Sequence, residues 1–259
     1  MKSERLWPLL RISLAGMNSR GSCWLLLGGA IIFAWLAPLV TPWEENPVIL
    51  QPARAQAAWM YAWIALLTWL PFQAAALAKR FRSEGMLEHL RAGGYPAGSL
   101  FLQLAGAVMV WMLAIGLLAV IVTVGFCRPG QPDEAALWAG LTLQYFALYS
   151  LSAAPLLLLG IALGTRVSEV VAFMVPVCVL FAGLFGGSVL APVLADSQSP
   201  VLKAVWVALP HYHLADLTPR LVFKMGPLPA GDFLQTACCL GLQGLALALL
   251  GLCVFRTRS

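Results

Sequence analysis

The sequence predicts an all-α, polytopic membrane protein with six transmembrane helices. Hydrophobic residues make up 61% of the 259 residues, charged residues make up only 10%, and the mean hydropathy is +0.84. Soluble domains carry about 25% charged residues, so this chain lacks the polar side chains that a fully water-facing surface needs. Its apolar runs are continuous rather than alternating, which favours membrane helices over the strands of a barrel.

Six uncharged runs are long enough to cross a hydrocarbon core about 30 Å thick. The predicted spans are Ser22–Val40, Ala57–Ala78, Ser99–Phe126, Ala135–Leu163, Val170–Leu194 and Phe233–Phe255. Pro71, Pro155 and Pro176 fall inside them, and membrane helices tolerate proline because neighbouring helices satisfy the freed carbonyls. Pro-Trp-Glu-Glu follows the first run in place of a small-residue cleavage site, so we expect this helix to be retained.

Residues 1–21 are predicted to form a helix that lies in the membrane interface before the first span. The apolar side chains of this segment fall on one helical stripe: Leu6, Trp7, Leu10, Leu14 and Met17. Arg11 and Asn18 lie away from the centre of that stripe. A basic tail without structure is the alternative.

Lysine and arginine predict the orientation. When the connecting segments are numbered alternately, eleven of the sixteen basic residues fall on the side that holds both termini. The positive-inside rule makes that side cytoplasmic. Seven acidic residues lie on the other side: Glu44, Glu45, Asp133, Glu134, Asp196, Asp216 and Asp232. The basic excess therefore suits anionic lipid rather than nucleic acid, and the composition predicts the lipid bilayer as a partner.

The connection at residues 79–98, between the second and third spans, is the longest predicted cytoplasmic segment. It reads Ser83-Glu84-Gly85-Met86-Leu87-Glu88-His89-Leu90-Arg91 and ends in Gly93-Gly94-Tyr95-Pro96. Met86, Leu87 and Leu90 can share one face of a short helix, and Gly-Gly with Tyr-Pro is a strong stop. Such a helix suits the docking of another protein, and an ordinary solvated loop is the alternative.

The segment at residues 195–232, between the fifth and sixth spans, is predicted to hold short helices in the outer interface. Val201–Leu209 and Leu217–Phe223 are apolar but too short to cross a bilayer. Pro210-His211-Tyr212-His213 and Asp216 lie between or beside them. We predict no soluble domain, so residues 1–259 form a single transmembrane domain.

Candidate chemistry is sparse. His211, His213 and Asp216 are the one cluster that resembles a metal site, but a helix would point the two histidines about 160° apart. An extended chain would turn Asp216 away from both, so interfacial polar residues are the favoured interpretation. No G-x-x-x-x-G-K-[ST] loop for a nucleotide is present. We therefore predict no catalytic, metal or cofactor site, and no charge at the centre of any span.

Several other features have a structural explanation. The six cysteines have no C-x-x-C spacing and are predicted to be buried as small hydrophobic residues. Two small-residue motifs, Gly160-x-x-x-Gly164 and Gly183-x-x-x-Gly187, would allow close helix contact. Gln144 in the fourth span and Gln243 in the sixth can either line a pathway or bond to neighbouring helices, and we favour the second role.

The layout and two local motifs resemble type-2 ATP-binding-cassette permeases. Glu84-Gly85-Met86-Leu87-Glu88-His89-Leu90 followed by Tyr95-Pro96 is similar to the family's coupling helix, which seats in a groove of an ATPase. Leu209-Pro210-His211-Tyr212 is similar to the proline and aromatic residue of its short outer helices. The sequence departs from the family at one place. Family members often have a lysine soon after the turn, where this sequence has Gln103 and no lysine nearby.

The resemblance implies the membrane subunit of an exporter in the bacterial inner membrane, with both termini cytoplasmic and with ATP and Mg bound by a separate ATPase subunit. It implies a homodimer, with a cargo path beside the first, second and fifth spans. The residues that it assigns to ATPase coupling are Glu84, Gly85, Met86, Leu87, Glu88, Leu90 and Arg91, and those of the outer helix turn are Pro210, His211 and Tyr212.

Two other functions remain open. The docking helix suits a non-transporting membrane scaffold or assembly factor that recruits a cytoplasmic partner. His211, His213 and Asp216 would suit an integral membrane enzyme. The sequence does not name the cargo.

Overall fold

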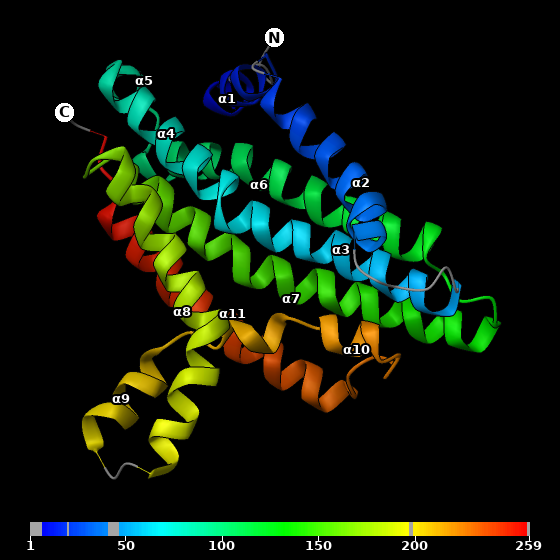
Figure 1. Ribbon diagram of the computed structural model, residues 1–259. Coiled ribbons are helices and arrows are strands. Elements are labelled where there is room, and N and C mark those ends of the chain that lie inside the picture. Colours follow the sequence, from blue (N-terminus) through cyan, green and yellow to red (C-terminus); the bar gives the residue numbers. More distant parts are fainter. Residues whose placement is uncertain (1–6, 20, 41–46, 197–198, 258–259) are drawn as a thin grey trace.

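The computed structural model is all-helical and describes residues 7–19, 21–40, 47–196 and 199–257 (Figure 1). The longer helices are α1 (Pro8–Ser19), α2 (Ser22–Val40), α3 (Pro47–Leu67), α4 (Trp69–Ser83), α6 (Ala97–Ile121), α7 (Pro132–Gly164), α8 (Glu169–Asp196) and α11 (Ala230–Val254). The shorter ones are α5 (Met86–Ala92), the π-helical turn η2 (Val122–Phe126), α9 (Pro200–Ala208), the 3-10 turn η3 (Tyr212–Ala215) and α10 (Thr218–Val222). The all-α prediction is confirmed.

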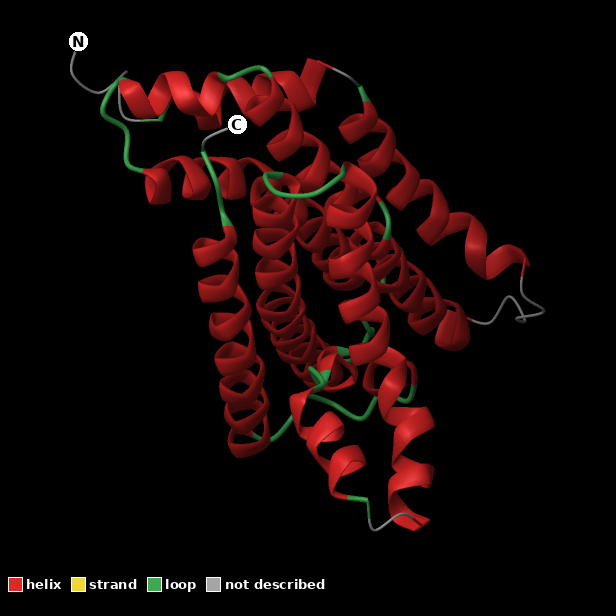
Figure 2. Ribbon diagram, turned by 90° about the vertical axis from the view of Figure 1, so that its left-hand side faces the viewer, coloured by secondary structure: helices red, strands yellow, loops and turns green. Residues whose placement is uncertain are grey.

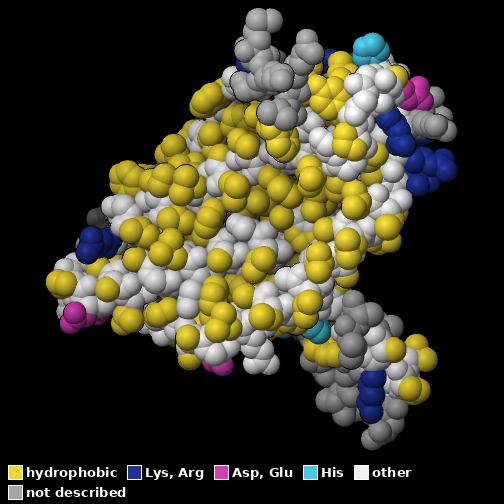
Figure 3. Space-filling model, turned by 180° about the vertical axis from the view of Figure 1, so that it is seen from behind, with side chains coloured by type: hydrophobic (Ala, Val, Ile, Leu, Met, Phe, Trp, Pro, Cys, Tyr) yellow, Lys and Arg dark blue, Asp and Glu magenta, His cyan; other side chains and the backbone are white. Residues whose placement is uncertain are grey.

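Five helical segments of the described chain are long and apolar enough to cross a bilayer. They are Gln51–Ser83, Ala97–Phe126, Pro132–Gly164, Glu169–Gly187 and Ala230–Val254. The pair α1 and α2, bent by 60°, makes a sixth if it counts as one span. Apolar side chains cover most of the face in Figure 3, and charged ones lie toward its edges. The chain is a multi-span membrane protein.

The second span is longer than predicted and is broken in the middle. It runs over Gln51–Ser83 rather than Ala57–Ala78, and α3 gives way to α4 at Thr68. Pro71 explains the break, because it has no N–H to bond the carbonyl of Leu67 one turn earlier. The hydroxyl of Thr68 donates to the carbonyl of Ile64 at 2.7 Å, which satisfies one acceptor beside the break. A predicted continuous helix is therefore two helices.

Helix α7 lies at the centre of the bundle and packs against α4, α6, α8 and α11. Helix α7 approaches α4 closely because Gly160 and Gly164 of α7 face α4 and have no side chains. A Cβ at Gly164 would stand 2.7 Å from the carbonyl oxygen of Ala75 and 3.0 Å from the Cβ of Ala78. The prediction that Gly160-x-x-x-Gly164 is a helix-packing motif is confirmed.

The N-terminal helix α1 is present, and most of the predicted stripe faces inward, because Met17 is buried and Leu10 and Leu14 pack against the core. Leu9, Ser13 and Met17 are buried, whereas Trp7 is 49% exposed. Leu6, also assigned to the stripe, lies outside the described residues. The contact with α6 includes one polar bond, in which the buried side chain of Gln103 accepts a hydrogen bond from the N–H of Leu9 at 3.0 Å. This bond satisfies one of the N–H groups that the first turn of a helix leaves without an intrahelical partner.

Both described ends of the chain lie at one end of the bundle (Figures 1 and 2). We call this end the terminal face, which consists of α1, α5, the turn between α7 and α8, and Phe255–Thr257. The other end, the opposite face, consists of residues 127–131 and 211–229. Helix α8 starts beside the terminal face and extends past the main bundle toward α9 (Figure 1).

Three cysteines contradict the prediction of burial. Cys178, Cys238 and Cys253 are exposed on α8 and α11, whereas Cys23 and Cys127 are buried. The reason is that α8 and α11 are the least covered of the described spans, with 22% and 17% of their apolar windows buried. All six cysteines are free thiols.

Replacing Gly164 with alanine should destabilise the protein by about 1 to 3 kcal/mol, because the added methyl group meets backbone of α4 that cannot rotate away. The measurement is the free energy of unfolding in mixed detergent micelles. Gly241→Ala is the matched control, since nothing lies within 4 Å of its Cβ position on α11. The control should be neutral or stabilising by up to about 1 kcal/mol. Equal losses in both variants would contradict the close α4–α7 contact.

Candidate functional site

The predicted docking helix exists as α5, but its apolar face turns into the protein. Leu87 is fully buried, and Met86 and Leu90 pack against the buried core. Gly85 starts the helix with φ of 70°, a conformation that a side chain would strain. The sequence therefore predicted the helix correctly, and the structure shows that its apolar residues anchor it rather than project from it.

The exposed surface of α5 and its flanking residues has three polar side chains. It consists of Glu84, His89 and Arg91 together with Ala92 and Gly93, and we call it the α5 surface. Glu84 pairs with Arg80 of α4 at 2.8 Å, and both side chains are about half exposed. Such an exposed i,i+4 pair contributes only about 0.3–0.5 kcal/mol, so a partner can displace it with little loss of free energy. Of the assigned coupling residues, only Glu84 and Arg91 reach this surface, while Glu88 is partly buried.

Arg91 also ties α5 to the end of the chain. Its guanidinium donates to the hydroxyl of Thr257 at 2.8 Å, and Thr257 is only 3% exposed. The N–H of Arg256 donates to the hydroxyl of Thr165 at 3.0 Å, and Arg82 at the end of α4 donates to the carbonyl of Thr165. Four segments of the terminal face are thus joined by hydrogen bonds. Sequence reasoning missed this network because its members lie far apart in the chain.

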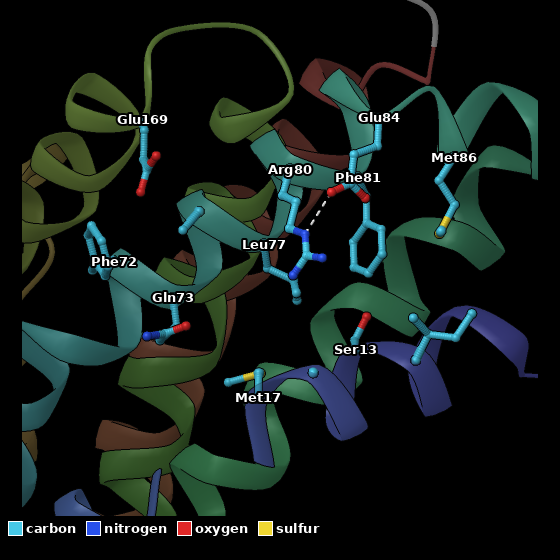
Figure 4. A pocket seen from close by; sticks show the side chains of 13 residues that line it. Ser13, Met17, Phe72, Gln73, Leu77, Arg80, Phe81, Glu84, Met86 and Glu169 are labelled. Carbon is cyan, nitrogen blue, oxygen red and sulfur yellow. Dashed lines mark hydrogen bonds and ion pairs between the residues drawn. The ribbon is translucent and has the colours of Figure 1, made fainter. Parts of the chain in front are cut away.

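A cavity of about 350 Å³ lies under the terminal face between α1, α4, the start of α5 and the start of α8 (Figure 4). Its polar lining residues are Ser13, Gln73, Arg80, Glu84 and Glu169. The hydroxyl of Ser13 is buried and has no hydrogen-bond partner among the described residues. Figure 4 shows Arg80 and Glu84 paired at the edge of this cavity, which we call the terminal cavity.

A second cavity, of about 320 Å³, lies on the other side of the break at Thr68, and we call it the opposite cavity. It is formed by α3, α8 and the residues from η3 to α10. Its lining residues are Gln56, Met60, Trp63, Ile64, Leu67, Leu184, Phe185, His213, Asp216 and Thr218. The two cavities therefore share the second span and α8, one at each end.

The outer helix turn is seated on α8 by two glycines. A Cβ at Gly183 would collide with the ring of Tyr212 and would lie 2.7 Å from the carbonyl oxygen of Pro210. A Cβ at Gly187 would lie 3.2 Å from Nδ1 of His213. The prediction that Gly183-x-x-x-Gly187 allows close helix contact is confirmed, and its partner is the short 3-10 helix η3 rather than another span. Two small residues spaced by one helical turn make a groove for any close partner.

Asp216 is brought to the middle of a buried aromatic network. The hydroxyl of Tyr145, in α7, donates to Oδ1 of Asp216 at 2.5 Å and accepts from Nε1 of Trp63 at 2.9 Å. The backbone N–H of Thr218 donates to the same Oδ1 at 3.0 Å. The ring of Tyr145 stacks on that of Trp59 with 3.9 Å between centroids. No sequence pattern predicted this network, because Trp63, Tyr145 and Asp216 lie in three separate segments.

Polar span residues that could have lined a pathway bond to neighbouring backbone. Gln144 accepts from the N–H of Leu228 at 2.7 Å and donates to the same residue's carbonyl at 3.0 Å. Gln243 accepts from the N–H of His211 at 3.4 Å. The structural role predicted for these two glutamines is confirmed.

His211, His213 and Asp216 do not come together as metal ligands. The two histidine rings meet edge to face with 5.6 Å between centroids, while Asp216 turns toward Tyr145. Within the described ranges, no group of three or more His, Cys, Asp and Glu side chains can hold a metal ion. Burial and the neighbouring imidazole of His213 lower the pKa of His211, and burial raises the pKa of Tyr212.

No protein-family model matches this chain, and no curated protein sequence matches it. Its function must therefore be argued from the geometry of the two cavities and the α5 surface.

Replacing Tyr145 with phenylalanine should lower the free energy of unfolding by about 1 to 3 kcal/mol, because Nε1 of Trp63 and Oδ1 of Asp216 each lose a buried partner. The measurement is unfolding in mixed micelles. Tyr149→Phe is the control, since the Tyr149 hydroxyl makes only a 3.3 Å bond to the carbonyl of Ala62. That control should lose about 0.6 kcal/mol or less, the average for a single bond between membrane helices. A smaller loss at position 145 than at 149 would refute the bridging role.

Proposed function

We propose that this chain is the membrane-spanning subunit of an exporter that is powered by ATP hydrolysis on a separate subunit. One observation carries the proposal: two cavities lie at opposite ends of the same pair of spans. The terminal cavity is lined by α4 and by Glu169 at the start of α8, and the opposite cavity by α3 and by Leu184 and Phe185 further along α8. Paired half-cavities of this kind suit a substrate path that opens to one side at a time.

The break at Thr68 supplies a point of motion between the two cavities. Helices α3 and α4 lie on either side of it, so a rotation there would widen one cavity and narrow the other. Hinges are formed by a few residues at the ends of elements, which is the position of Thr68. Helix α5 follows α4 after only Glu84 and Gly85, so a force on α5 reaches α4 directly.

The energy source in this proposal is an ATPase that docks on the α5 surface. The sequence contains no nucleotide-binding loop, so ATP and Mg would be bound by the partner and this chain would carry no cofactor. We infer a cytoplasmic terminal face from the positive-inside bias, and the family resemblance supports a bacterial inner membrane. A polar docking surface is accessible to a cytoplasmic partner, whereas Leu87 is not.

A second copy of this chain is the other proposed partner. Met60 and Ile64 on α3 and Phe181 and Phe185 on α8 are exposed apolar residues that flank the opposite cavity. A homodimer with two-fold symmetry would place the same surface of each copy together and would enclose the cavity between the copies. This arrangement agrees with the cargo path that the family resemblance implies.

Replacing His89 with aspartate should weaken stimulation of the ATPase at least fivefold, because it places a new charge in the centre of the docking surface. The measurement is ATP hydrolysis by the ATPase encoded next to this chain, after co-purification through a tag on one subunit. Substitution at Met86 or Leu87 would be a poorer test, since both pack inward and would damage the fold.

Gln131→Asp is the matched control, because it adds the same charge at an exposed position of the opposite face, where an N-cap aspartate is favourable. Stimulation should be unchanged in this control. If no ATPase co-purifies with the wild-type chain, the exporter proposal fails and a membrane scaffold becomes the better hypothesis.

A further inference from the structure

Asp216 is an acidic side chain with half of its hydrogen-bonding capacity unused. Both bonds that it receives, from Tyr145 and from Thr218, end on Oδ1. No described donor bonds to Oδ2, and Asp216 belongs to neither of the two ion pairs of the described chain. Among the described residues that line the opposite cavity, it is the only Asp, Glu, Lys or Arg. The cavity therefore contains one carboxylate that no described Lys or Arg pairs with.

Three cations on this side of the bundle are engaged elsewhere. The guanidinium of Arg54 lies over the ring of Trp35, 5.4 Å from its centroid. Arg220 donates to the carbonyls of Gly226 and Pro227, and Lys224 lies 3.9 Å from Glu134. A carboxylate that is partly removed from water and lacks a counter-charge is unfavourable unless a cation comes to it. No described Lys or Arg lines the cavity beside Asp216, and His213 is the one other titratable group of its lining, so a ligand can supply the counter-charge.

The walls of the opposite cavity select which cation fits. Trp63 and Phe185 give it two aromatic walls, and aromatic faces attract organic cations. Met60, Ile64 and Leu67 add apolar surface. A hard inorganic ion such as Ca²⁺ prefers six or more oxygen ligands, which these side chains do not offer. The volume of about 320 Å³ lies at the lower end of the range for small-molecule sites.

The cavity is open along the side between α3 and α8. Met60, Ile64 and Phe185 line it and are 51%, 38% and 49% exposed. These apolar side chains face either lipid or a second copy of the chain, so a ligand with apolar groups can enter from that side. An anion would be repelled by Asp216, and an uncharged ligand would leave its charge unpaired.

We propose that the opposite cavity binds an organic cation with apolar groups, and that the free carboxylate oxygen of Asp216 pairs with its charge. Tyr145 and Thr218 position this carboxylate by holding Oδ1, which leaves Oδ2 for the ligand. The inference names the cargo class of the proposed exporter and rests on that proposed function for its transport role. The binding site itself does not depend on an ATPase.

The test is equilibrium dialysis of radiolabelled tetraphenylphosphonium against the purified chain in lipid nanodiscs, with empty nanodiscs subtracted. Saturable binding of one probe per chain is expected, without any ATPase present. Tetraphenylborate, which has the same shape and the opposite charge, should not compete. Absence of saturable tetraphenylphosphonium binding by the folded wild-type chain would overturn the proposal.

Asp216→Asn is the decisive variant, because asparagine keeps an Oδ1 acceptor for Tyr145 and Thr218 while it removes the charge. Its affinity for the cation should fall at least tenfold, about 1.4 kcal/mol. Glu134→Gln is the matched control, since Glu134 is an acid of the same side that does not line the opposite cavity. It should bind like the wild type. Equal affinity in Asp216→Asn and wild type would overturn the role of the carboxylate.

Phe185→Ala gives a second test if Asp216→Asn does not fold. Phe185 is half exposed and takes no part in the hydrogen bonds that hold Tyr145, so the variant should fold and bind the cation several-fold more weakly. Unchanged affinity in this variant would contradict the aromatic wall.

A lipid amine can supply the same chemistry as a free organic cation. Nanodiscs of phosphatidylethanolamine should then compete with tetraphenylphosphonium, whereas nanodiscs of phosphatidylglycerol should not. Competition would identify the lipid headgroup as the source of the cation, and lack of competition would favour a free organic cation. If the ATPase associates but no cation binds, only this inference fails. If the cation binds and no ATPase associates, the site stands and the exporter does not.

Discussion

The hydroxyl of Tyr145 is the interaction on which the arrangement of the opposite face depends. It joins Trp63 of α3, its own helix α7, and Asp216 and Thr218 beyond η3. A membrane interior supplies no water to satisfy a polar group that loses its partner, so these bonds must be made within the protein. Because they converge on one oxygen, the segment after η3 has one position in which all are satisfied. The opposite cavity exists because that position leaves a gap between α3 and α8.

The terminal face is held by a different means. Here short polar bonds join α4, α5, the turn after α7 and the end of the chain, while Leu87 and Phe255 are buried beneath them. These bonds tie α5 to the end of α4 through the turn after α7 and the end of the chain. The break at Thr68 separates α4, which is joined to this network, from α3, which is bonded to Tyr145 through Trp63. In the proposed exporter, a displacement of α5 would therefore be passed to α4 and on to the break.

The sequence predicted the helices better than it predicted their faces. Five of the six predicted spans match helices of the structure to within about three residues at each end, because the cost of burying charge in lipid limits where a span begins and ends. Faces are set by single contacts that a pattern does not contain. The N–H of Leu9 bonds to Gln103 of α6, and the core packing of Leu87 turns the apolar side of α5 inward. The hydrogen bonds of Asp216 could not be predicted from a sequence pattern, because Asp216 and Tyr145 lie 71 residues apart in the chain.

The absence of charge from the span centres has a consequence for how a binding carboxylate can be placed in this protein. An aspartate at the middle of a span costs about 2.5–3.5 kcal/mol when the helix inserts, and it must then find a partner in the bundle. Asp216 avoids this cost because it belongs to a polar connection between two spans. Gly183 and Gly187 receive the turn η3 on α8, and the carboxylate then reaches Tyr145 inside the bundle. Each span thus inserts as an apolar helix, and the charge arrives only when the outer segment folds onto them. A search for functional residues confined to the spans would overlook such a site, so in proteins of this kind the connections that fold back onto the bundle are where ligand-binding charges should be sought.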